Sequence, residues 1–504
     1  MFKSEIYIQR RNRLKQQLSS SIGYSGIALF IGHDESPINF TDNSYPFRQD
    51  SSFLYFFGHN LPKLIGVIDI DEGIDYLFGN DAGIDELIWT GPQPTIKELG
   101  ERVGISRTGG IKKFESFFQR ACSYKRKIHF LPPYRKETVF KLLKWFRIVD
   151  ITRIGDISSD LEILPSQKLL SEKALSSSIK LQPSIELIKA VVAQREIKTD
   201  EEIAHIEEAV NISAKMHIEA MRVAKHGMTE QQVVSAIYKK MLDAGASLNS
   251  DVLSNPSVSM AFTPIATTRG ETLHNHFYGN VIKKGDLFLL DAGVESSMHY
   301  ASDLSTTFPV DGKLTTIQKE IYQITLDAHK KAVLALAPKI PFKDVHFKAC
   351  KTIVNGLKDV GLMKGNVDDA VALGAHALFF PCGTGHMMGL DAHDMEDLGE
   401  VYVGYDGEPK SEQFGLKSLR LAKPLKAGFV LTVEPGIYFI PALIDKWRAE
   451  NKFLHFINYK ALEQYRKFGG IRNEEDYLIT ETGARLLGKS PLPYHLIDGN
   501  SASN

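Results

Sequence analysis

The stretches DLFLLDAG (286–293) and ASDLSTTFPV (301–310) decide the fold of the second half of this chain. In the first stretch, an apolar run with the length of a buried strand ends at Asp291. In the second, Asp303 directly precedes another run of β-favouring residues. A hairpin of these two strands would place the two carboxylates side by side. Two adjacent anions repel and raise each other's pKa unless a cation lies between them, so the pattern favours a metal ion.

Two further strand ends carry acids. The stretch GFVLTVEPG (428–436) runs apolar until Glu434, which precedes a Pro-Gly turn. The stretch GGIRNEEDYLIT (469–480) places Glu474 at the entry to another strand. Taken alone, each acid is better explained as a strand-end residue that reaches solvent. Because burial of an unpartnered carboxylate costs several kcal/mol, four such places together are hard to dismiss as a coincidence.

Histidines lie between these acidic strand ends. The glycine-rich stretch FFPCGTGHMMGLDAHD (379–394) contains His386 and His393. A helix would put both rings on one face, but the flanking proline and glycines favour a structured loop. In TLHNHFYG (272–279), His274 and His276 alternate as in a strand, which would also place them on one face.

Composition excludes several classes of protein. The 504 residues are 43% hydrophobic and 24% charged, which is enough chain for two or three domains. A formal net charge of -1 disfavours nucleic-acid and membrane binding. Three distant cysteines (Cys122, Cys350 and Cys382) form no disulfide framework, and no signal peptide or transmembrane run is evident. We therefore expect a soluble, cytoplasmic protein.

Motif searches remove further alternatives. The glycines at 383, 385 and 389 miss the dinucleotide fingerprint, and GISRTGG (104–110) lacks the Lys-Ser/Thr of a phosphate loop. No G-x-S-x-G elbow is present, and Cys382 has no evident base, so covalent catalysis has little support. The chain has no fixed-period repeat, which excludes solenoids and propellers.

The pattern predicts two α/β domains. From 27 to 70 it predicts short strands and turns, including 27–31, SFLYFFGHN (52–60) and LIGVIDI (64–70), and this domain ends near residue 183. A helix over 185–195 and a long amphipathic helix, capped by Thr199 and stopped at Gly227, open the second domain. Its remaining predicted strands are 287–290, 305–310, 429–433 and 476–479, and its remaining predicted helices are 230–243, 316–337 and 342–360. The end of the chain, 491–504, is predicted to be a frayed tail.

Five motifs in order, DAGVE, SDLSTTF, GTGHMMGLDAHD, VEPGIY and IRNEEDYLIT, resemble those of the proline-specific metallopeptidases of the pita-bread fold. These enzymes are the Xaa-Pro aminopeptidases (aminopeptidase P) and the Xaa-Pro dipeptidases (prolidases). NSYPFRQDSSFLYFFGHNLP and IWTGPQP resemble the amino-terminal domain of aminopeptidase P. The resemblance implies an α/β (α+β) chain with a creatinase/aminopeptidase-P-like domain (1–183), a pita-bread catalytic domain (184–490) and a tail (491–504).

The resemblance also implies a dinuclear metal site. Asp291 would hold one ion, Asp303 and Glu474 would bridge both, and His386 with Glu434 would hold the other. One imidazole and four carboxylates form an oxygen-rich set that suits Mn²⁺, with Co²⁺ and Zn²⁺ as alternatives. Two such ions acidify a bridging water and supply a hydroxide that attacks the scissile carbonyl.

Further roles follow from the same resemblance. Glu434 would shuttle the proton, His274 and His393 would face the substrate, and Arg472 would orient a bridging carboxylate. Asp42 and Trp89 stand where related enzymes place an acid that recognises the substrate amine and an aromatic that lines the cleft. The expected substrates are short peptides with proline at the second position, and the expected assembly is a homodimer or homotetramer.

The chain departs from the family pattern in three places. Cys382 stands where many relatives carry a histidine, and a thiol is a weaker hydrogen-bond donor. The turn between the two aspartates is one residue longer than usual, so its tip at 296–299 is expected to bulge. An insertion at 440–469 contains Trp447, Phe453, Phe456 and Ile457, which predict a helical elaboration on the rim of the site or at an oligomer interface.

Two alternatives to the aminopeptidase reading stay open. A prolidase would require a dipeptide with a free carboxylate, but the amino-terminal match favours the aminopeptidase. A non-catalytic pita-bread binding module is the alternative from another class. Such modules, and the metal-free creatinases of the same fold, are disfavoured because all five metal-ligand positions are present.

Overall fold

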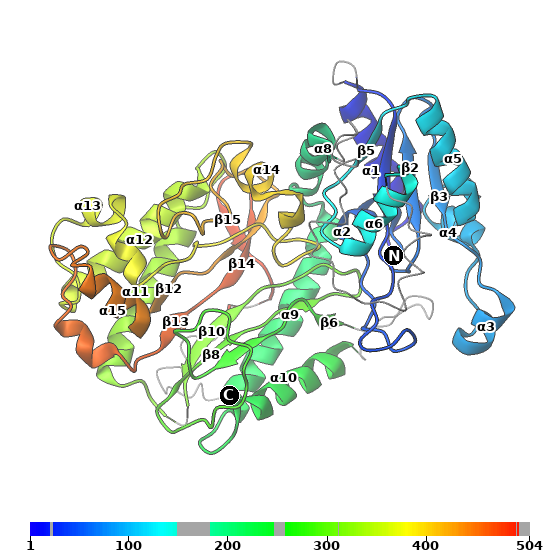
Figure 1. Ribbon diagram of the computed structural model, residues 1–504. Helices are drawn as coiled ribbons and strands as arrows, with labels where there is room; N and C mark the ends of the chain where they lie inside the picture. Colours follow the sequence, from blue (N-terminus) through cyan, green and yellow to red (C-terminus); the bar gives the residue numbers. More distant parts are fainter. Residues whose placement is uncertain (21–23, 149–181, 246–257, 311, 490, 493–504) are drawn as a thin grey trace, which may run out of the picture. The chain divides into compact units, whose positions relative to one another are not determined.

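The computed structural model describes residues 1–20, 24–148, 182–245, 258–310, 312–489 and 491–492. The chain forms two compact units, Met1–Gln194 and Arg195–Asn504 (Figure 1). The predicted domain boundary at 183/184 stays a prediction, and most of the predicted tail lies outside the described residues. Among the helices of the described ranges, none has the length and apolar character to cross a membrane.

The first unit contains a mixed five-stranded sheet in the order β4-β3-β2-β1-β5. Its strands are β1 (Ile27–Ile31), β2 (Ile65–Asp69), β3 (Asp75–Phe78), β4 (Arg107–Gly109) and β5 (Ile128–Phe130). Alternate strand residues such as Ile27 and Leu29 pack in one apolar core with helices α5 (Ile111–Ser123) and α6 (Lys136–Trp145). The side chain of Phe30 points to the opposite face of the sheet, where its ring centroid lies 4.9 Å from that of Phe56 in helix α2 (Ser51–Phe57). Side chains from both faces of the sheet are therefore packed against helices.

One predicted strand of this unit is wrong. The stretch 52–60 contains helix α2 (Ser51–Phe57), not a strand. The Asp50 side chain caps its first turn by accepting a hydrogen bond from the amide of Phe53, and Gly58 ends it at φ +72°. Every residue of α2 is buried, so no periodicity distinguishes a helix from a strand. The other helices of the unit are α1 (Ser4–Ser19), α3 (Ile84–Thr90), α4 (Ile96–Arg102) and α8 (Ile185–Arg195).

Short antiparallel sheets form the framework of the second unit. They are ordered β10-β8-β7, β11-β14-β15, β12-β13 and β6-β9. The strands are β6 (Ser259–Met260), β7 (Ile265–Thr267), β8 (Leu287–Asp291), β9 (Val294–Glu295), β10 (Ser305–Pro309), β11 (Val430–Val433), β12 (Gly436–Tyr438), β13 (Gly470–Arg472), β14 (Glu475–Ile479) and β15 (Ala484–Leu486). The predicted strands at 287–290, 305–310, 429–433 and 476–479 are thus confirmed to within one residue at each end.

Four long helices cover these sheets. Figure 1 shows α9 (Asp200–Val223) and α10 (Glu230–Gly245) beside β8 and β10, and α11 (Thr316–Val333) and α12 (Phe342–Asp359) beside β12. Side chains of all four helices and of β8 share one apolar core. The predicted capping box of α9 is confirmed, because the Thr199 side chain and Glu202 satisfy each other's backbone amides. The helix ends at Val223, before the predicted stop at Gly227.

Shorter helical segments complete the second unit. They are α13 (Val367–Ala372), η3 (Ala375–Leu378), η4 (Glu396–Leu398), α14 (Glu400–Tyr405), α15 (Pro441–Ala449) and η5 (Ala461–Tyr465). The last two belong to the insertion at 440–469, whose predicted helical character is confirmed. Trp447, Phe456 and Ile457 are buried in the main core, and Phe453 packs against it.

Candidate metal centre

The β8–β10 hairpin brings the first two acids together. The strands pair antiparallel with Ser305 opposite Asp291, so Asp303 lies two residues beyond that pair on the same end of the hairpin. Both carboxylates are buried. The turn between them has its tip at 297–298, and His299 adopts φ +64°. The expected bulge at 296–299 stays a prediction.

Glu474 joins these aspartates from between β13 and β14. Its backbone amide donates to the carbonyl oxygen of Ser305 at 2.9 Å, and the Ser305 amide donates back to the Glu474 carbonyl at 3.3 Å. The Ser305 hydroxyl also donates to Glu474 Oε2 at 2.8 Å. As a result, Asp291, Asp303 and Glu474 each offer an oxygen within 4.8 Å of the others.

A loop attached to β11 positions His386. The His386 amide donates to Thr432 Oγ1 at 3.2 Å, and the Thr432 amide donates to the His386 carbonyl at 3.0 Å. A Cβ at Gly385 would lie 2.0 Å from the Thr432 carbonyl oxygen, so this approach requires glycine. Since β11 leads directly to Glu434, the same strand positions both ligand candidates. His386 Nε2 lies 3.6 Å from Asp303 Oδ2 and 3.6 Å from Glu434 Oε1.

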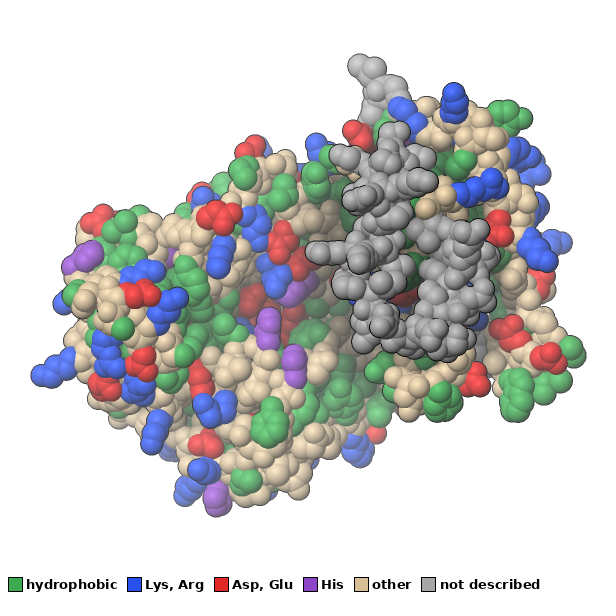
Figure 2. All heavy atoms as spheres, in the orientation of Figure 1, with side chains coloured by type: hydrophobic (Ala, Val, Ile, Leu, Met, Phe, Trp, Pro, Cys, Tyr) green, Lys and Arg blue, Asp and Glu red, His purple; other side chains and the backbone are tan. Residues whose placement is uncertain are grey.

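All five predicted metal ligands line one cavity of about 710 Å³. They belong to three overlapping groups of possible ligands: Asp291, Asp303 and Glu474; His386, Glu434 and Glu474; and Asp303 and His386 with His393. In Figure 2, acidic and histidine side chains gather in a hollow over this part of the second unit. The cavity wall also contains apolar side chains, namely Leu273, Phe414, Ile440, Ala442 and Leu443. Three of these come from the insertion, so part of the insertion forms the cavity wall.

The electrostatics of the cavity suit divalent cations. Burial and then the neighbouring carboxylates hold the pKa of Asp303 and of Glu474 well above the ordinary range. Burial raises the pKa of Glu434 to about 7, against the opposing effect of Arg472. Asp291 Oδ1 is buried and accepts no hydrogen bond from the residues that the structure describes. Crowded, buried acids with an unpartnered oxygen are the donor set that bound cations would satisfy.

His386 presents its ring in the form that binds metals. Nδ1 lies 3.1 Å from the Met387 carbonyl oxygen, so it carries the proton and leaves the Nε2 lone pair facing the carboxylates. Burial and the neighbouring His393 lower the pKa of His386 well below its ordinary value. The rings of His386 and His393 are 4.2 Å apart at their centroids.

The predicted substrate-facing histidines have different surroundings. His274 lines the cavity from a turn, so the predicted strand at 274–276 is wrong. His276 instead lies 3.3 Å from the Pro264 carbonyl oxygen and is not part of the cavity wall. His393 lines the cavity, is half-buried and approaches Glu396 at 3.3 Å.

Arg472 donates directly to a different carboxylate from the one predicted. Its Nη2 donates to Asp291, which is not one of the predicted bridging carboxylates. Within the described residues, its hydrogen-bonded connection to Glu474 runs through Ser305, whose hydroxyl accepts from Arg472 Nε at 2.9 Å. Arg472 Nη1 also donates to the Tyr438 hydroxyl at 3.2 Å. Burial raises the pKa of the neighbouring Cys382 thiol to about 12, although a hydrogen bond with Tyr438 acts in the opposite direction. Cys382 lines the cavity as a protonated thiol at neutral pH.

Sequence reasoning missed several residues of the site. Ser305 and Tyr438 act through contacts that only the fold creates, although the Ser-Thr-Thr run at 305–307 is a polar signal inside a predicted strand. Arg420 lines the cavity and donates to Glu396 Oε2 at 2.5 Å, and no sequence motif marks it.

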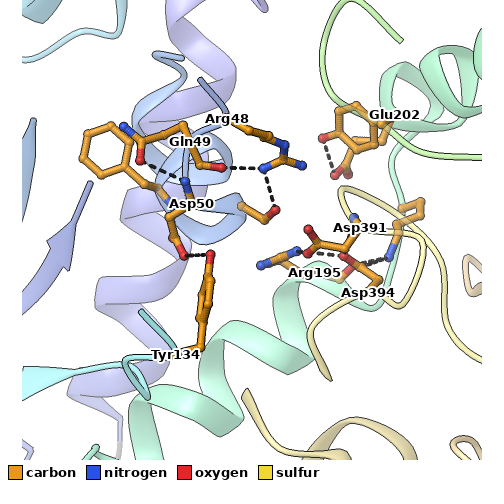
Figure 3. Close-up of polar contacts among 12 residues, drawn as sticks. Arg48, Gln49, Asp50, Tyr134, Arg195, Glu202, Asp391 and Asp394 are labelled. Carbon is orange, nitrogen blue, oxygen red and sulfur yellow. Dashed lines mark hydrogen bonds and ion pairs between the residues drawn. The ribbon is translucent and has the colours of Figure 1, made fainter. Parts of the chain in front are cut away.

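A buried ion network holds the histidine loop. Asp394 accepts from Arg195 Nη2 at 2.7 Å (Figure 3). It also accepts from Lys198 Nζ at 2.9 Å. Burial alone would raise the pKa of Asp394, but the two cations lower it. The Asp394 amide donates to the Met387 carbonyl at 3.0 Å, which closes the loop between His386 and His393.

Asp42 and Trp89 belong to the first unit. Both are exposed, and 86% of the Trp89 surface is accessible. Neither is among the described residues that line the cavity of the second unit. Their predicted roles stay predictions.

Comparison with known proteins agrees with this geometry. The human Xaa-Pro dipeptidase is 28% identical over 492 residues, which cover 96% of this chain and 90% of that protein. A probable Xaa-Pro aminopeptidase of Phaeosphaeria nodorum is 32% identical over 277 residues, or 55% of this chain and 56% of that protein. The structure of Escherichia coli aminopeptidase P with the inhibitor Pro-Leu superposes with a TM-score of 0.71 at 27% identity, covering 96% of this chain and 95% of the other.

Family models match both halves of the chain. Residues 7–129 match the aminopeptidase P N-terminal domain, and residues 204–481 match metallopeptidase family M24. The second match spans more than half of the chain and contains every ligand candidate of the cavity. The chain therefore belongs to metallopeptidase family M24, the pita-bread metallopeptidases, and carries an aminopeptidase-P-type amino-terminal domain.

Proposed function

We propose that this protein is an Xaa-Pro aminopeptidase that releases the amino-terminal residue preceding proline from short peptides. The observation that carries the proposal is the convergence of Asp291, Asp303, His386, Glu434 and Glu474 on one cavity, with Asp303 and Glu474 each shared between two ligand groups. Shared carboxylates are the expected arrangement for two ions close together.

The metal centre proposed here holds two divalent ions, with Mn²⁺ as the first candidate and Co²⁺ or Zn²⁺ as alternatives. Four carboxylates and one imidazole form a hard, oxygen-rich donor set of high coordination number. When bound, the ions supply Lewis acidity and a water that is acidic at neutral pH. Asp291, Asp303 and Glu474 would hold one ion, and His386, Glu434 and Glu474 the other, with Asp303 shared.

The surrounding residues have roles that fit their positions. Glu434 lines the cavity within a proposed ligand group, so its carboxylate would be placed to accept and return a proton of the attacking water. His274 and His393 line the cavity, where they can hydrogen-bond a substrate carbonyl or a developing oxyanion. Arg472 holds the Asp291 carboxylate and, through Ser305, that of Glu474.

The cavity also supports recognition of proline. An Xaa-Pro bond has no amide N-H, so a site that relies on backbone hydrogen bonding to the substrate binds it poorly. Here the apolar side chains of Leu273, Phe414, Ile440 and Leu443 can contact a pyrrolidine ring beside the acidic cluster.

A dipeptidase acting on Xaa-Pro dipeptides is the second candidate. The guanidinium of Arg420 lines the cavity, and a cation is the natural partner of the free carboxylate of a dipeptide. The alignment with the human Xaa-Pro dipeptidase over 96% of this chain supports the same reading.

A substrate panel separates the two candidates. The metal-loaded protein is tested on Gly-Pro, on an Xaa-Pro-Yaa tripeptide and on the matched Xaa-Ala-Yaa peptide. The aminopeptidase proposal expects cleavage of the Pro tripeptide and little of the Ala peptide, whereas cleavage confined to Gly-Pro would establish the dipeptidase. In that case Arg420→Ala should raise the KM for Gly-Pro more than tenfold, because loss of a charged contact costs about 1.5–3 kcal/mol.

A chelator tests the non-catalytic alternative in the same experiment. Activity should disappear with bound metal and return when Mn²⁺ is restored. A protein that holds no metal and hydrolyses none of the three peptides would instead be a binding module. Cytoplasmic location, a homodimer or homotetramer, and the roles of Asp42 and Trp89 remain part of the proposal.

A further inference from the structure

A second group of metal-binding side chains lies outside the cavity wall. His346 and Cys350 project from α12, and His376 belongs to η3. All three are buried, and each offers a ligand atom within 4.8 Å of the other two. None of them is among the residues that line the cavity of the metal centre.

The geometry of His346 and Cys350 resembles that of a ligand pair. They are four residues apart, on one face of α12, and Cys350 Sγ lies 3.4 Å from His346 Nε2. In a tetrahedral zinc site with Zn–N near 2.1 Å and Zn–S near 2.3 Å, these atoms would be about 3.6 Å apart. The other nitrogen, His346 Nδ1, lies 2.8 Å from the Thr384 hydroxyl. A hydrogen bond at the remote nitrogen is typical of a metal-binding histidine because it fixes the tautomer and the ring.

His376 supplies an independent observation. Both ring nitrogens are buried and lack a hydrogen bond of good geometry within the described part of the chain, although weaker contacts with the backbone of Ala370 and Val371 act on the ring. Buried polar atoms of this kind are rare, and an absent ion is one of their ordinary explanations. Burial lowers the pKa of His376 to about 4, although the backbone of Ala370 and Val371 acts in the opposite direction. The ring is therefore neutral at pH 7, which is the form that binds metals.

We propose that His346 Nε2, Cys350 Sγ and one ring nitrogen of His376 bind a single Zn²⁺ ion, separate from the dinuclear centre. One thiolate and two imidazoles form a softer donor set than the carboxylate-rich cavity and suit zinc better than manganese. Binding replaces the S–H bond of Cys350 with an S–Zn bond and releases the proton to solvent. Three protein donors leave the fourth tetrahedral position to a water molecule.

The site would connect two elements beside the loop that contains His386 and His393. A bound ion would join α12 to η3, whose apolar side chains belong to one core. His346 contacts the Thr384 hydroxyl, and the Thr384 carbonyl accepts from the Glu434 amide at 2.7 Å. The ion would therefore stabilise the backbone next to the metal centre without contributing a ligand to it.

Cobalt substitution tests the proposal through the thiolate. The full-length chain is refolded with Co²⁺, so that buried positions can load, and its absorption spectrum is recorded. The five ligands of the dinuclear centre contain no sulfur, so a near-ultraviolet thiolate-to-cobalt band reports only on a cysteine-bound ion. We expect this band and one additional equivalent of Co²⁺ in the wild-type protein, and the loss of both in Cys350→Ser.

Matched variants assign the band. Cys382→Ser removes the thiol of the main cavity and should keep the band, as should Cys122→Ser in the first unit. Asp303→Asn should keep it even if the dinuclear centre is lost, and His376→Gln should remove it or weaken Co²⁺ binding at least tenfold. A wild-type spectrum without the band, or a band that persists in Cys350→Ser, would overturn the proposal. Circular dichroism of each variant shows that it has folded.

Discussion

The Ser305 hydroxyl donates a hydrogen bond of 2.8 Å to Glu474 Oε2, so a side chain on β10 fixes a carboxylate that arrives from another sheet. The same hydroxyl accepts from Arg472 Nε. Ser305→Ala should therefore lower metal affinity by about 10–100-fold, as loss of such outer contacts generally does. Competition with a chelator measures this change. Ser235→Ala, which removes an exposed hydroxyl on α10, is the control and should leave affinity unchanged.

Asp303→Asn should have opposite effects on activity and on the stability of the metal-free chain. Loss of a shared anion should lower turnover by more than about 100-fold. The same change removes one of several mutually repelling buried acids, so the metal-free variant should melt above the metal-free wild type. Calorimetry after chelation measures the second effect, with the exposed Asp327→Asn as control. Wild-type turnover in Asp303→Asn would refute its assignment as a ligand.

The raised pKa of Glu434 gives the metal-free protein a defined pH dependence. Its pKa of about 7 lies above the ordinary 4.5, so the folded chain retains a proton that the unfolded chain loses. This contribution to stability is fully present below pH 4.5 and declines as the pH rises towards 7. Added metal should reverse the trend, because metal and proton compete for the same oxygen.

Thermal melts from about pH 5 to 8, with and without metal, measure this dependence. In Glu434→Gln the decline between pH 4.5 and 7 should be smaller, because this variant lacks the titrating group. An unchanged slope in the variant would assign the pH dependence to other acids of the cavity.

His393→Ala should separate metal binding from catalysis. His393 lines the cavity and pairs with Glu396. The proposed metal centre takes its ligands from five other side chains, although His393 lies close enough to Asp303 and His386 to be a ligand itself. Metal content should stay near the wild-type value, while kcat falls about 10²–10⁴-fold if the ring acts on the reacting carbonyl. Metal loss in proportion to the loss of activity would show that His393 is itself a ligand.

Asp394→Asn should destabilise the second unit. It leaves the buried cations of Arg195 and Lys198 without their shared carboxylate, and loss of one partner of a buried ion pair costs about 3–5 kcal/mol. Urea unfolding followed by circular dichroism measures the loss. The more exposed Asp391→Asn, which removes a contact of 3.4 Å to Arg195, should cost much less.

Sequence predicted the parts of the site that depend on local pattern. The strands that end at Asp291 and Glu434 are apolar runs, and a strand that stops at an acid is visible without a fold. The order of the motifs then indicated the family, which the matches to its models confirm.

Other features depend on contacts that the sequence does not contain. The helix at 51–57 was predicted as a strand because burial on every side removes the periodicity on which such predictions rest. Ser305, Arg420 and Tyr438 become part of the site through pairing between distant segments. The second histidine and cysteine cluster is equally non-local, since η3 approaches α12 only in the folded chain.

The insertion between β12 and β13 gives the cavity an intrinsic fluorescent reporter. Trp447 packs against Phe414, with ring centroids 5.9 Å apart, and Phe414 lines the cavity. The other two tryptophans, Trp89 and Trp145, belong to the first unit. A peptide that displaces the Phe414 ring should therefore change the emission of Trp447, so that substrate entry can be followed optically on an unlabelled protein.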